Sequence, residues 1–250
     1  MQNITYLVFD IETIPVGWDT LSESQQEYLL RRKESDEEQE QAKKEMALSP
    51  MTAHVVCIGL QMMKTNEAGS YNLLKRKAYS LDTAVPEGES RVVTLATGDE
   101  CTLCSEKDIL GHFWNIFDAH DRRFKDVHLV SFNGRNFDAP FLMLRSALLG
   151  VKPSRNLMSG TKFNYQLHTD LIDELTFYNP SAYGATRRYN FDFFARAFGL
   201  QSPKAEGIDG SKVSEFFEKG RIEEITEYCL RDVDTTWKLF EIWKKYLSWG

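Results

Sequence analysis

Hydrophobic and polar positions at the start of the chain follow a pattern that predicts a β-strand. The segment ITYLVFDIETI, residues 4–14, is rich in β-branched and aromatic residues, and Pro15 and Gly17 close it. Its apolar density indicates a buried central strand. Further strands are predicted at residues 54–63, 75–81, 91–97, 126–133 and 163–175.

Apolar residues at helical spacing predict helices between and after these strands. They cover residues 105–120, 134–150, 190–200 and 211–249. Ser105 is a suitable N-cap for the first of them, and Gly150 is a natural residue just beyond the end of the second. Because strands come early and helices late, we expect a mixed sheet with helices packed on it, in one α/β domain over residues 1–250.

The segment from Trp18 to Pro50 departs from this pattern, since it is dense in Glu, Gln, Lys and Arg and has few apolar positions. Such a charge mixture is typical of a solvated helix with charge pairs four residues apart. We therefore predict an inserted helical arm at about residues 18–50. A partner-binding helix is the alternative that the sequence leaves open.

Composition limits the class of protein. With 250 residues and 42% hydrophobic content, the chain can bury a large core without disulfides, and its four cysteines are expected to be reduced thiols. The net charge of -7 argues against a protein that coats nucleic acid. It does not exclude a nuclease, because bound divalent cations invert the field of a carboxylate cluster. No signal peptide or membrane span is evident, so we expect a soluble, cytoplasmic protein.

Two acids lie within the first predicted strand. Asp10 and Glu12 are two residues apart, so both side chains leave the same face of the strand. Ionised carboxylates near a core need a cation or a shifted pKa, and no basic residue is close in sequence. A position at the solvated end of the strand is the alternative.

Two further acids stand on predicted helices. Asp138 follows the strand at 126–133 and, with Pro140 in the first helical turn, is placed to cap that helix, which would be a sufficient structural role. Tyr228 and Asp232 are four apart and share a face of the last helix, where a lone acid is usually solvated. The first strand, the helix at Asp138 and the last helix each offer an acid at a position that could face one shared cavity.

Three segments occur in the order FDIETIP, FNGRNFDAPFL and YCLRDVDTTWKLF. They resemble the motifs of the ribonuclease H-like DEDD exonucleases, which also occur in the proofreading domain of family-B DNA polymerases. The stretch that begins at Lys204 and continues through GIDGSKVSEFFEKGRIEEITEYCLRDVDTTWKLF is similar to predicted stand-alone 3′-5′ exonucleases related to that domain. Jointly the motifs are specific, although any one is weak. The resemblance implies a ribonuclease H-like mixed sheet flanked by helices.

The resemblance also implies a catalytic set. Its metal-binding acids are Asp10, Glu12, Asp138 and Asp232. Tyr228, four residues before the last acid, places the chain in the tyrosine subclass, because Glu227 stands where the other subclass has histidine. No polymerase domain follows the last helix, so we expect any coupling to synthesis to need a polymerase or repair partner in trans.

From this set we expect phosphodiester hydrolysis with two Mg²⁺ ions, for which Mn²⁺ can substitute, about 3.5–4 Å apart. Asp10 would bridge both ions. Glu12 and Asp232 would hold the ion that carries the attacking water, and Asp138 would support the other ion through water. Tyr228 would orient the attacking water by a hydrogen bond.

The expected substrate is a nucleic acid with a free 3′ end, with DNA favoured over RNA and single strands favoured over double strands. The candidate substrate-binding residues are Asn133, Phe137, Arg187, Arg188 and Lys204. The arginines would contact phosphate and the aromatic ring would stack on a base. Solvated arginines, and core packing for at least two of the rings Phe132, Phe137 and Phe141, are the alternatives.

Three rival interpretations remain open. An exoribonuclease or an enzyme that trims short oligonucleotides would use the same acids. A non-catalytic binding module could keep the fold, although its expected sign is the loss of an acid, and all four are present. The C-x-x-C pair of Cys101 and Cys104 matches half of a zinc site, but no second half follows it, so two reduced thiols are favoured.

Overall fold

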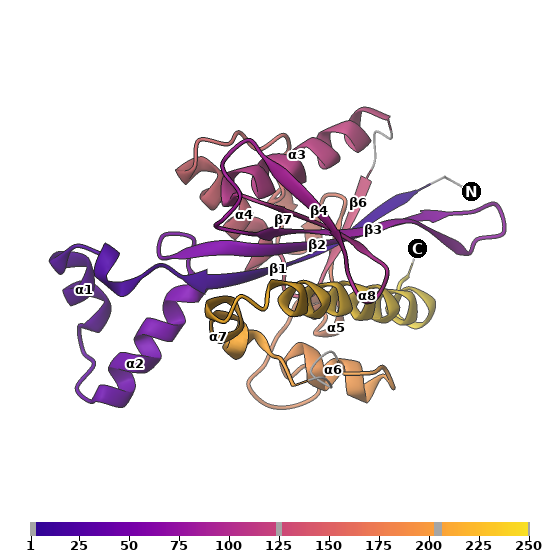
Figure 1. The fold of residues 1–250 in the computed structure, drawn as a ribbon. Coiled ribbons are helices and arrows are strands. Elements are labelled where there is room, and N and C mark those ends of the chain that lie inside the picture. The colour runs from indigo at the N-terminus through magenta and orange to yellow at the C-terminus, as the bar shows by residue number, and fades with distance from the viewer. Residues whose placement is uncertain (1–3, 124–126, 203–206, 250) are drawn as a thin grey trace.

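The computed structural model describes residues 4–123, 127–202 and 207–249, and in this part of the chain seven strands form one mixed sheet (Figure 1). The strands are β1 (Thr5–Pro15), β2 (Ala53–Thr65), β3 (Tyr71–Leu81), β4 (Ser90–Thr94), β5 (Glu100–Cys104), β6 (Val127–Ser131) and β9 (His168–Asp170). Their order is β4-β5-β3-β2-β1-β6-β9. The pairs β1–β2, β2–β3 and β4–β5 are antiparallel, whereas β3–β5, β1–β6 and β6–β9 are parallel.

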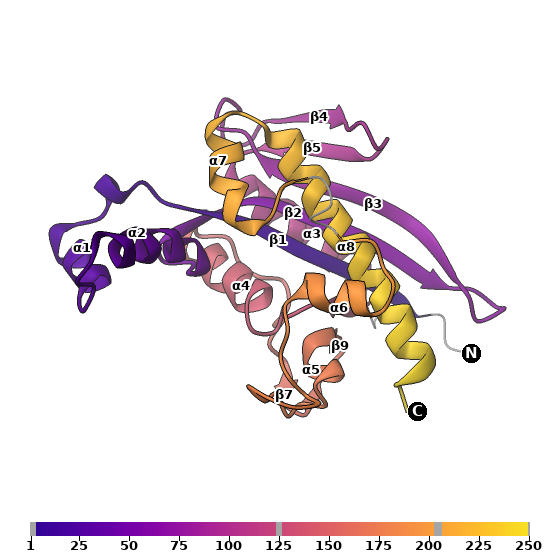
Figure 2. The same cartoon turned by 90° about the horizontal axis from the view of Figure 1, so that it is seen from below.

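Helices flank the sheet on both sides (Figures 1 and 2). On one side lie α3 (Glu106–Arg123) and α4 (Asp138–Leu148). On the other lie α5 (Leu171–Leu175), α6 (Phe191–Ala197), α7 (Val213–Glu218) and α8 (Ile222–Tyr246), with a 3₁₀ turn at Gly210–Lys212 before α7. A mixed sheet with helices on both sides confirms the predicted α/β class.

Strand β1 packs against helices through alternate residues. The ring of Phe9 contacts Phe113 of α3, with centroids 6.0 Å apart. The ring of Tyr6 points the other way and contacts Trp237 and Phe240 of α8, at 5.6 and 5.2 Å. Because side chains alternate along a strand, the even-numbered residues of this part of β1 face α8.

The strand predicted over residues 163–175 is wrong in extent. The chain there forms a short hairpin, β7 (Gly160–Thr161) with β8 (Asn164–Tyr165), then β9, and then α5. Asp170 ends β9 because its side chain caps α5, accepting a hydrogen bond from the Ile172 amide at 3.3 Å. Periodicity could not separate a short strand from the short helix that follows it.

Two other predictions need correction. The helix predicted over 211–249 is interrupted at Gly220, whose φ of +70° lies in the left-handed region that commonly ends a helix. Strand β5 was not predicted, and it pairs with β4 as the second strand of a hairpin. By contrast, the Ser105 cap is confirmed, since its hydroxyl accepts from the Asp108 amide at 3.2 Å.

The charged segment at about 18–50 is a helical arm, as predicted. It contains α1 (Glu23–Leu30), α2 (Asp36–Glu45) and 3₁₀ turns at Trp18–Thr20 and Met46–Leu48. Each helix begins with a capping box, at Ser22 and Ser35, which satisfies its first amides without tertiary contacts. Figure 1 shows both helices projecting beyond the end of the sheet.

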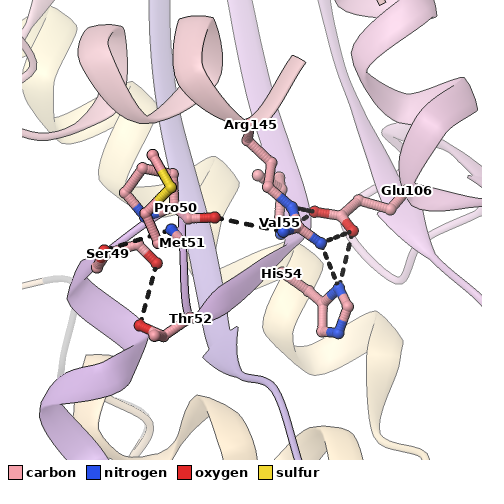
Figure 3. A network of polar contacts seen from close by, with 8 residues as sticks. All are labelled: Ser49, Pro50, Met51, Thr52, His54, Val55, Glu106 and Arg145. Carbon is pink, nitrogen blue, oxygen red and sulfur yellow. Dashed lines mark hydrogen bonds and ion pairs between the residues drawn. The ribbon is translucent and has the colours of Figure 1, made fainter. Parts of the chain in front are cut away.

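A polar network joins the base of the arm to α3 and α4 (Figure 3). Arg145 of α4 donates to both carboxylate oxygens of Glu106, at 2.7 and 2.8 Å, and to the Pro50 carbonyl at 3.3 Å. Glu106 also accepts from the Val55 amide at 2.8 Å, and the ring of His54 contacts Glu106 at 2.8 Å. The network holds α4, α3 and the start of β2 together.

Candidate active site

The first two predicted acids lie where β1 passes beneath α8. Asp10 and Glu12 have even numbers, so they point to the same side of the sheet as Tyr6. Asp10 is half-buried, and Glu12 is only 7% exposed. A bulge between Glu12 and Thr13 follows, which is a common feature of strands beside functional sites. This burial excludes the alternative of a solvated strand end.

Asp138 is the first residue of α4, and its side chain crosses to β1. Its Oδ1 accepts a hydrogen bond from the Ile11 amide at 3.0 Å, and the residue is 3% exposed. The prediction that Asp138 caps α4 is wrong, because Phe137 occupies the N-cap position and makes no side-chain cap bond. The carboxylate instead fixes the start of α4 against the strand that carries Asp10 and Glu12.

Helix α8 brings Tyr228 and Asp232 to the same place. Both are buried, and burial, followed by the negative charge of Asp232, raises the pKa of the Tyr228 hydroxyl, so the two side chains lie close together. The helix can approach the sheet because Gly59 pairs with Asp10 on the neighbouring strand. A Cβ at Gly59 would lie 2.9 Å from the Cys229 sulfur and 3.3 Å from the Cys229 carbonyl. Gly59 is thus a residue that shapes the site, and the sequence did not reveal it.

Burial and mutual repulsion raise the pKa values of the carboxylates. For Asp10 the largest cause is burial, followed by the charges of Asp138, Asp232 and Glu12. Burial also raises the pKa of Glu12, followed by the charge of Asp232. The pKa of Asp138 is raised to about 7, mainly by burial. Asp10, Glu12 and Asp138 form no ion pair with any residue that the structure describes. Such a cluster needs cations.

The donor atoms suit a divalent metal. Ligand atoms of Asp10, Glu12 and Cys229 all lie within 4.8 Å of one another, the only such group of three found in the described ranges. Carboxylate oxygens are the ligands that magnesium and manganese prefer. Cys229 was missed in the sequence, where it simply follows Tyr228. Burial and a hydrogen bond with Cys57 raise the pKa of its thiol well above the usual range.

Asp170 fixes the turn that carries the second motif, and it too was missed. It is fully buried, and its two carboxylate oxygens accept from the amides of Asn133 and Arg135, at 2.7 and 2.8 Å. Asn133 has a φ of +67°, and a Cβ on Gly134 would lie 2.4 Å from the Ser131 hydroxyl oxygen. The turn therefore requires glycine there and a carboxylate behind it.

Two of the predicted substrate-binding residues contact each other at this turn. The Arg188 guanidinium donates to the side-chain oxygen of Asn133. Arg187 instead lies over the ring of Tyr189, 4.8 Å from its centroid. A hollow of about 350 Å³ adjoins the turn. Residues lining it include Arg135, Lys162, Tyr165 and Arg188.

The aromatic residues of the second motif pack inward. Phe141 is buried, and Phe132 contacts Phe191 at 4.8 Å, which confirms core packing for two of the three rings. Phe137 is half-buried and lies 5.5 Å from Phe141, so its predicted contact with substrate stays a prediction. Lys204, the last predicted substrate residue, lies outside the described residues.

Cys101 and Cys104 are both fully buried in β5. Three residues apart on a strand, they point to opposite faces of the sheet. Burial raises the pKa of Cys101 to about 11 and that of Cys104 to about 12. Neither belongs to a group of three candidate ligands within the residues described. These facts favour two ordinary thiols over the zinc alternative.

Comparisons with known proteins agree with this geometry. Residues 73–246 match the family described as "Predicted 3'-5' exonuclease related to the exonuclease domain of PolB". DNA polymerase 1 of Sulfolobus acidocaldarius is 30% identical over 174 residues, which is 64% of this chain and 19% of the polymerase. The structure of the family B DNA polymerase from the archaeon Pyrobaculum calidifontis aligns with 96% of this chain and 24% of its own, with a TM-score of 0.53 and 18% identity.

The fold defines a structural class, an α/β domain with a ribonuclease H-like mixed sheet flanked by helices. Within that class, it belongs to the family of predicted 3′-5′ exonucleases related to the exonuclease domain of PolB. Membership implies a hydrolase that acts on nucleic acid with a divalent metal. The chain spans about a fifth to a quarter of the length of the polymerases that it matches.

The family match begins after β2, so it does not include Asp10 and Glu12. It is the packing of β1 against α4 and α8 that joins these acids to Asp138 and Asp232.

Across the ranges that the structure describes, every helix is too short or too polar to cross a membrane.

Proposed function

We propose that this chain removes nucleotides from the 3′ end of single-stranded DNA by hydrolysing the terminal phosphodiester bond with two magnesium ions. The residues proposed to hold the ions are Asp10, Glu12, Asp138 and Asp232. The observation that carries the proposal is their convergence from β1, α4 and α8 into one cluster, in which burial and then mutual repulsion raise the pKa values of Asp10, Glu12 and Asp138.

The electrostatic couplings support different roles for these residues. After burial, the charges of all three other acids raise the pKa of Asp10, so Asp10 lies near each of them. This central position suits a carboxylate that bridges two ions. The charge of Asp232 is, after burial, the largest cause of the raised pKa of Tyr228, so the hydroxyl lies close enough to that acid to orient a water molecule beside it. Bound magnesium would supply an activated water and stabilise the oxygen of the departing nucleotide.

The turn of the second motif supports a single strand as substrate. Arg188 and Asn133 are hydrogen-bonded there, next to a hollow that Lys162 and Tyr165 help to line. Basic groups suit backbone phosphate, and an aromatic ring can stack on any base. A flexible single strand presents both of these features to one site, whereas a duplex hides the faces of its bases.

The proposal predicts that Asp10→Ala abolishes nuclease activity. Loss of a shared metal ligand removes several kcal/mol of transition-state stabilisation, which corresponds to a rate loss of about 10³-fold or more. Cleavage of an end-labelled single strand with magnesium, with circular dichroism to check folding, measures this. The matched control is Asp234→Ala, since Asp234 is also acidic but pairs with Lys238 at 2.6 Å, outside the cluster. Undiminished activity of Asp10→Ala would refute the proposal.

The same assay compares substrates and metals. Wild-type protein is expected to degrade DNA from its 3′ end faster than RNA of the same sequence, in magnesium or manganese but not with a chelator. Faster loss of RNA would instead make the protein an exoribonuclease that uses the same carboxylates, because the 2′-hydroxyl is the feature that separates the two substrates.

A further inference from the structure

A cysteine lies inside the carboxylate cluster. The Cys229 sulfur is 3.5 Å from the carbonyl oxygen of Asp10 and 3.8 Å from its carboxylate Oδ2. The residue is fully buried, against the strand position where Gly59 makes room for it. The sulfur, an Asp10 oxygen and a Glu12 oxygen lie within 4.8 Å of one another. A soft ligand is thus placed among hard ones.

The Glu12 side chain provides a second observation. Glu12 is more than nine-tenths buried, yet its carboxylate makes no hydrogen bond and no ion pair with any residue that the structure describes. A buried carboxylate without such a partner is costly unless a cation binds it. Because its oxygen belongs to the same group as the Cys229 sulfur, a cation held by Glu12 would lie close to that sulfur.

The distances suit an ion that accepts both oxygen and sulfur. Zinc binds thiolate sulfur at about 2.3 Å and carboxylate oxygen at about 2.0–2.2 Å, so two ligands of one ion are up to about 4 Å apart. Small side-chain rotations would bring the three atoms into this range. Three protein ligands and one water complete a tetrahedral zinc site. Magnesium, in contrast, takes oxygen ligands.

We propose that Asp10, Glu12 and Cys229 form a zinc-binding site that overlaps the proposed magnesium centre, so that zinc displaces magnesium and inhibits the enzyme. When zinc binds, the Cys229 sulfur forms the new bond and its proton passes to solvent. Only the inhibition rests on the proposed nuclease function, since zinc binding itself requires no turnover.

The other cysteines of the neighbourhood define the controls. Cys57 accepts a hydrogen bond from Ser80 at 3.3 Å, and Cys101 lies 3.9 Å from the Thr226 hydroxyl. Neither is in the group of three ligands, as far as the described chain extends. Cys104 is as buried as Cys229 but lies on β5, so Cys104→Ala removes an equivalent thiol away from the site.

Cobalt is the probe for this site, because a cobalt–thiolate bond gives a charge-transfer absorption in the near ultraviolet. The wild-type chain is expected to show this band, Cys104→Ala to keep it, and Cys229→Ala to lose it. Zinc affinity, measured by competition with a chromophoric chelator, should fall at least about tenfold in Cys229→Ala, since even loss of an outer partner of a metal ligand costs roughly 10–100-fold. Zinc should also inhibit Cys229→Ala less than wild type, relative to each enzyme's own rate in magnesium.

Absence of the band in wild-type protein at saturating cobalt overturns the zinc site, even if Cys229→Ala does not fold. Cys229→Ser is a second variant of nearly the same size, and a band or a zinc affinity that it leaves unchanged overturns the site as well. The two proposals fail separately. An active nuclease without the band refutes only the zinc site, whereas a protein with the band that cuts neither DNA nor RNA refutes only the nuclease.

Discussion

The Tyr228 hydroxyl is held in its protonated form by its surroundings. Burial is the largest cause of its raised pKa, followed by the negative charges of Asp232, Glu12 and Asp10. A phenol in this environment cannot serve as a general base, because ionising it would add another negative charge to the cluster. It can donate or accept a hydrogen bond, which agrees with a role in orienting water.

Tyr228→Phe is therefore predicted to slow cleavage without abolishing it. The change removes one hydrogen bond near charged groups, worth about 1.5–3 kcal/mol, which corresponds to a loss of roughly 10–150-fold in rate. Single-turnover cleavage in magnesium, compared with Asp10→Ala, measures this. A variant as inactive as Asp10→Ala would show that the hydroxyl does more than position water.

Among single residues, the acids of the site were predictable from the sequence, but the residues that position them were not. Asp10, Glu12 and Asp138 were found because three motifs occur in order, and their burial agrees with a shared site. Asp170 and Gly59 had no such signal. Their importance depends on which backbone amide or helix they meet, and that is decided by strand register and helix packing rather than by neighbours in sequence.

Among the secondary-structure elements, the crossing of α8 over β1 and β2 controls the site. Tyr228 and Asp232 reach the acids of β1 only if the helix lies close to the sheet, and Gly59 is a point where the two approach too closely for an added Cβ. Overpacking a buried contact typically costs about 1–3 kcal/mol, and a displacement of about 1 Å can cost 10²-fold in rate.

Gly59→Ala is predicted to lower both stability and activity. The new Cβ would press on the sulfur and backbone of Cys229, so the helix must move away from Asp10. The matched control is Gly111→Ala in α3, where an added Cβ meets nothing within 4 Å and removal of a helical glycine should stabilise by about 0.5–1 kcal/mol. Thermal unfolding and cleavage assays compare them. A Gly59→Ala protein as stable and active as wild type would contradict this account of the packing.

Elements with long, regular patterns were predictable, and short ones were not. The strand at 4–14, the helix at 134–150 and the charged arm at 18–50 all have clear patterns of apolar or charged residues, and each is present. The division of residues 163–175 depends on the side chain of Asp170, which ends one element and begins another. Such a boundary is set by one hydrogen bond, which periodicity does not detect.

For the whole molecule, metal binding and protonation should compete for the same carboxylates. A pKa that is raised in the folded state stabilises the fold below the unfolded pKa, and this stability is lost as pH rises through the folded pKa. Asp138 and Asp170, with pKa values of about 7, contribute in this direction. His128 and His168 oppose it at lower pH, because burial lowers their pKa values to about 4 and about 3.

The stabilisation caused by magnesium should consequently increase with pH. The effect of magnesium is the difference between the stability measured with magnesium and the stability measured with a chelator at the same pH. The contributions of His128, His168 and Asp170 cancel in this difference, because these residues lie outside the proposed ligand set. What remains is the competition between protons and metal for the carboxylates. At about a hundred times its Kd, magnesium adds about 2.7 kcal/mol, or roughly 5–10 °C in Tm for a chain of this size. We expect most of this shift at pH 8 and much less at pH 6. In Asp138→Asn the shift at pH 8 should be smaller than in wild type, because one of the two ions loses a supporting carboxylate, and without metal this variant should be more stable than wild type at pH 8. Calorimetry at both values measures the shifts. A magnesium effect that is equal at pH 6 and pH 8 would mean that the metal does not bind at the carboxylates whose pKa values are raised.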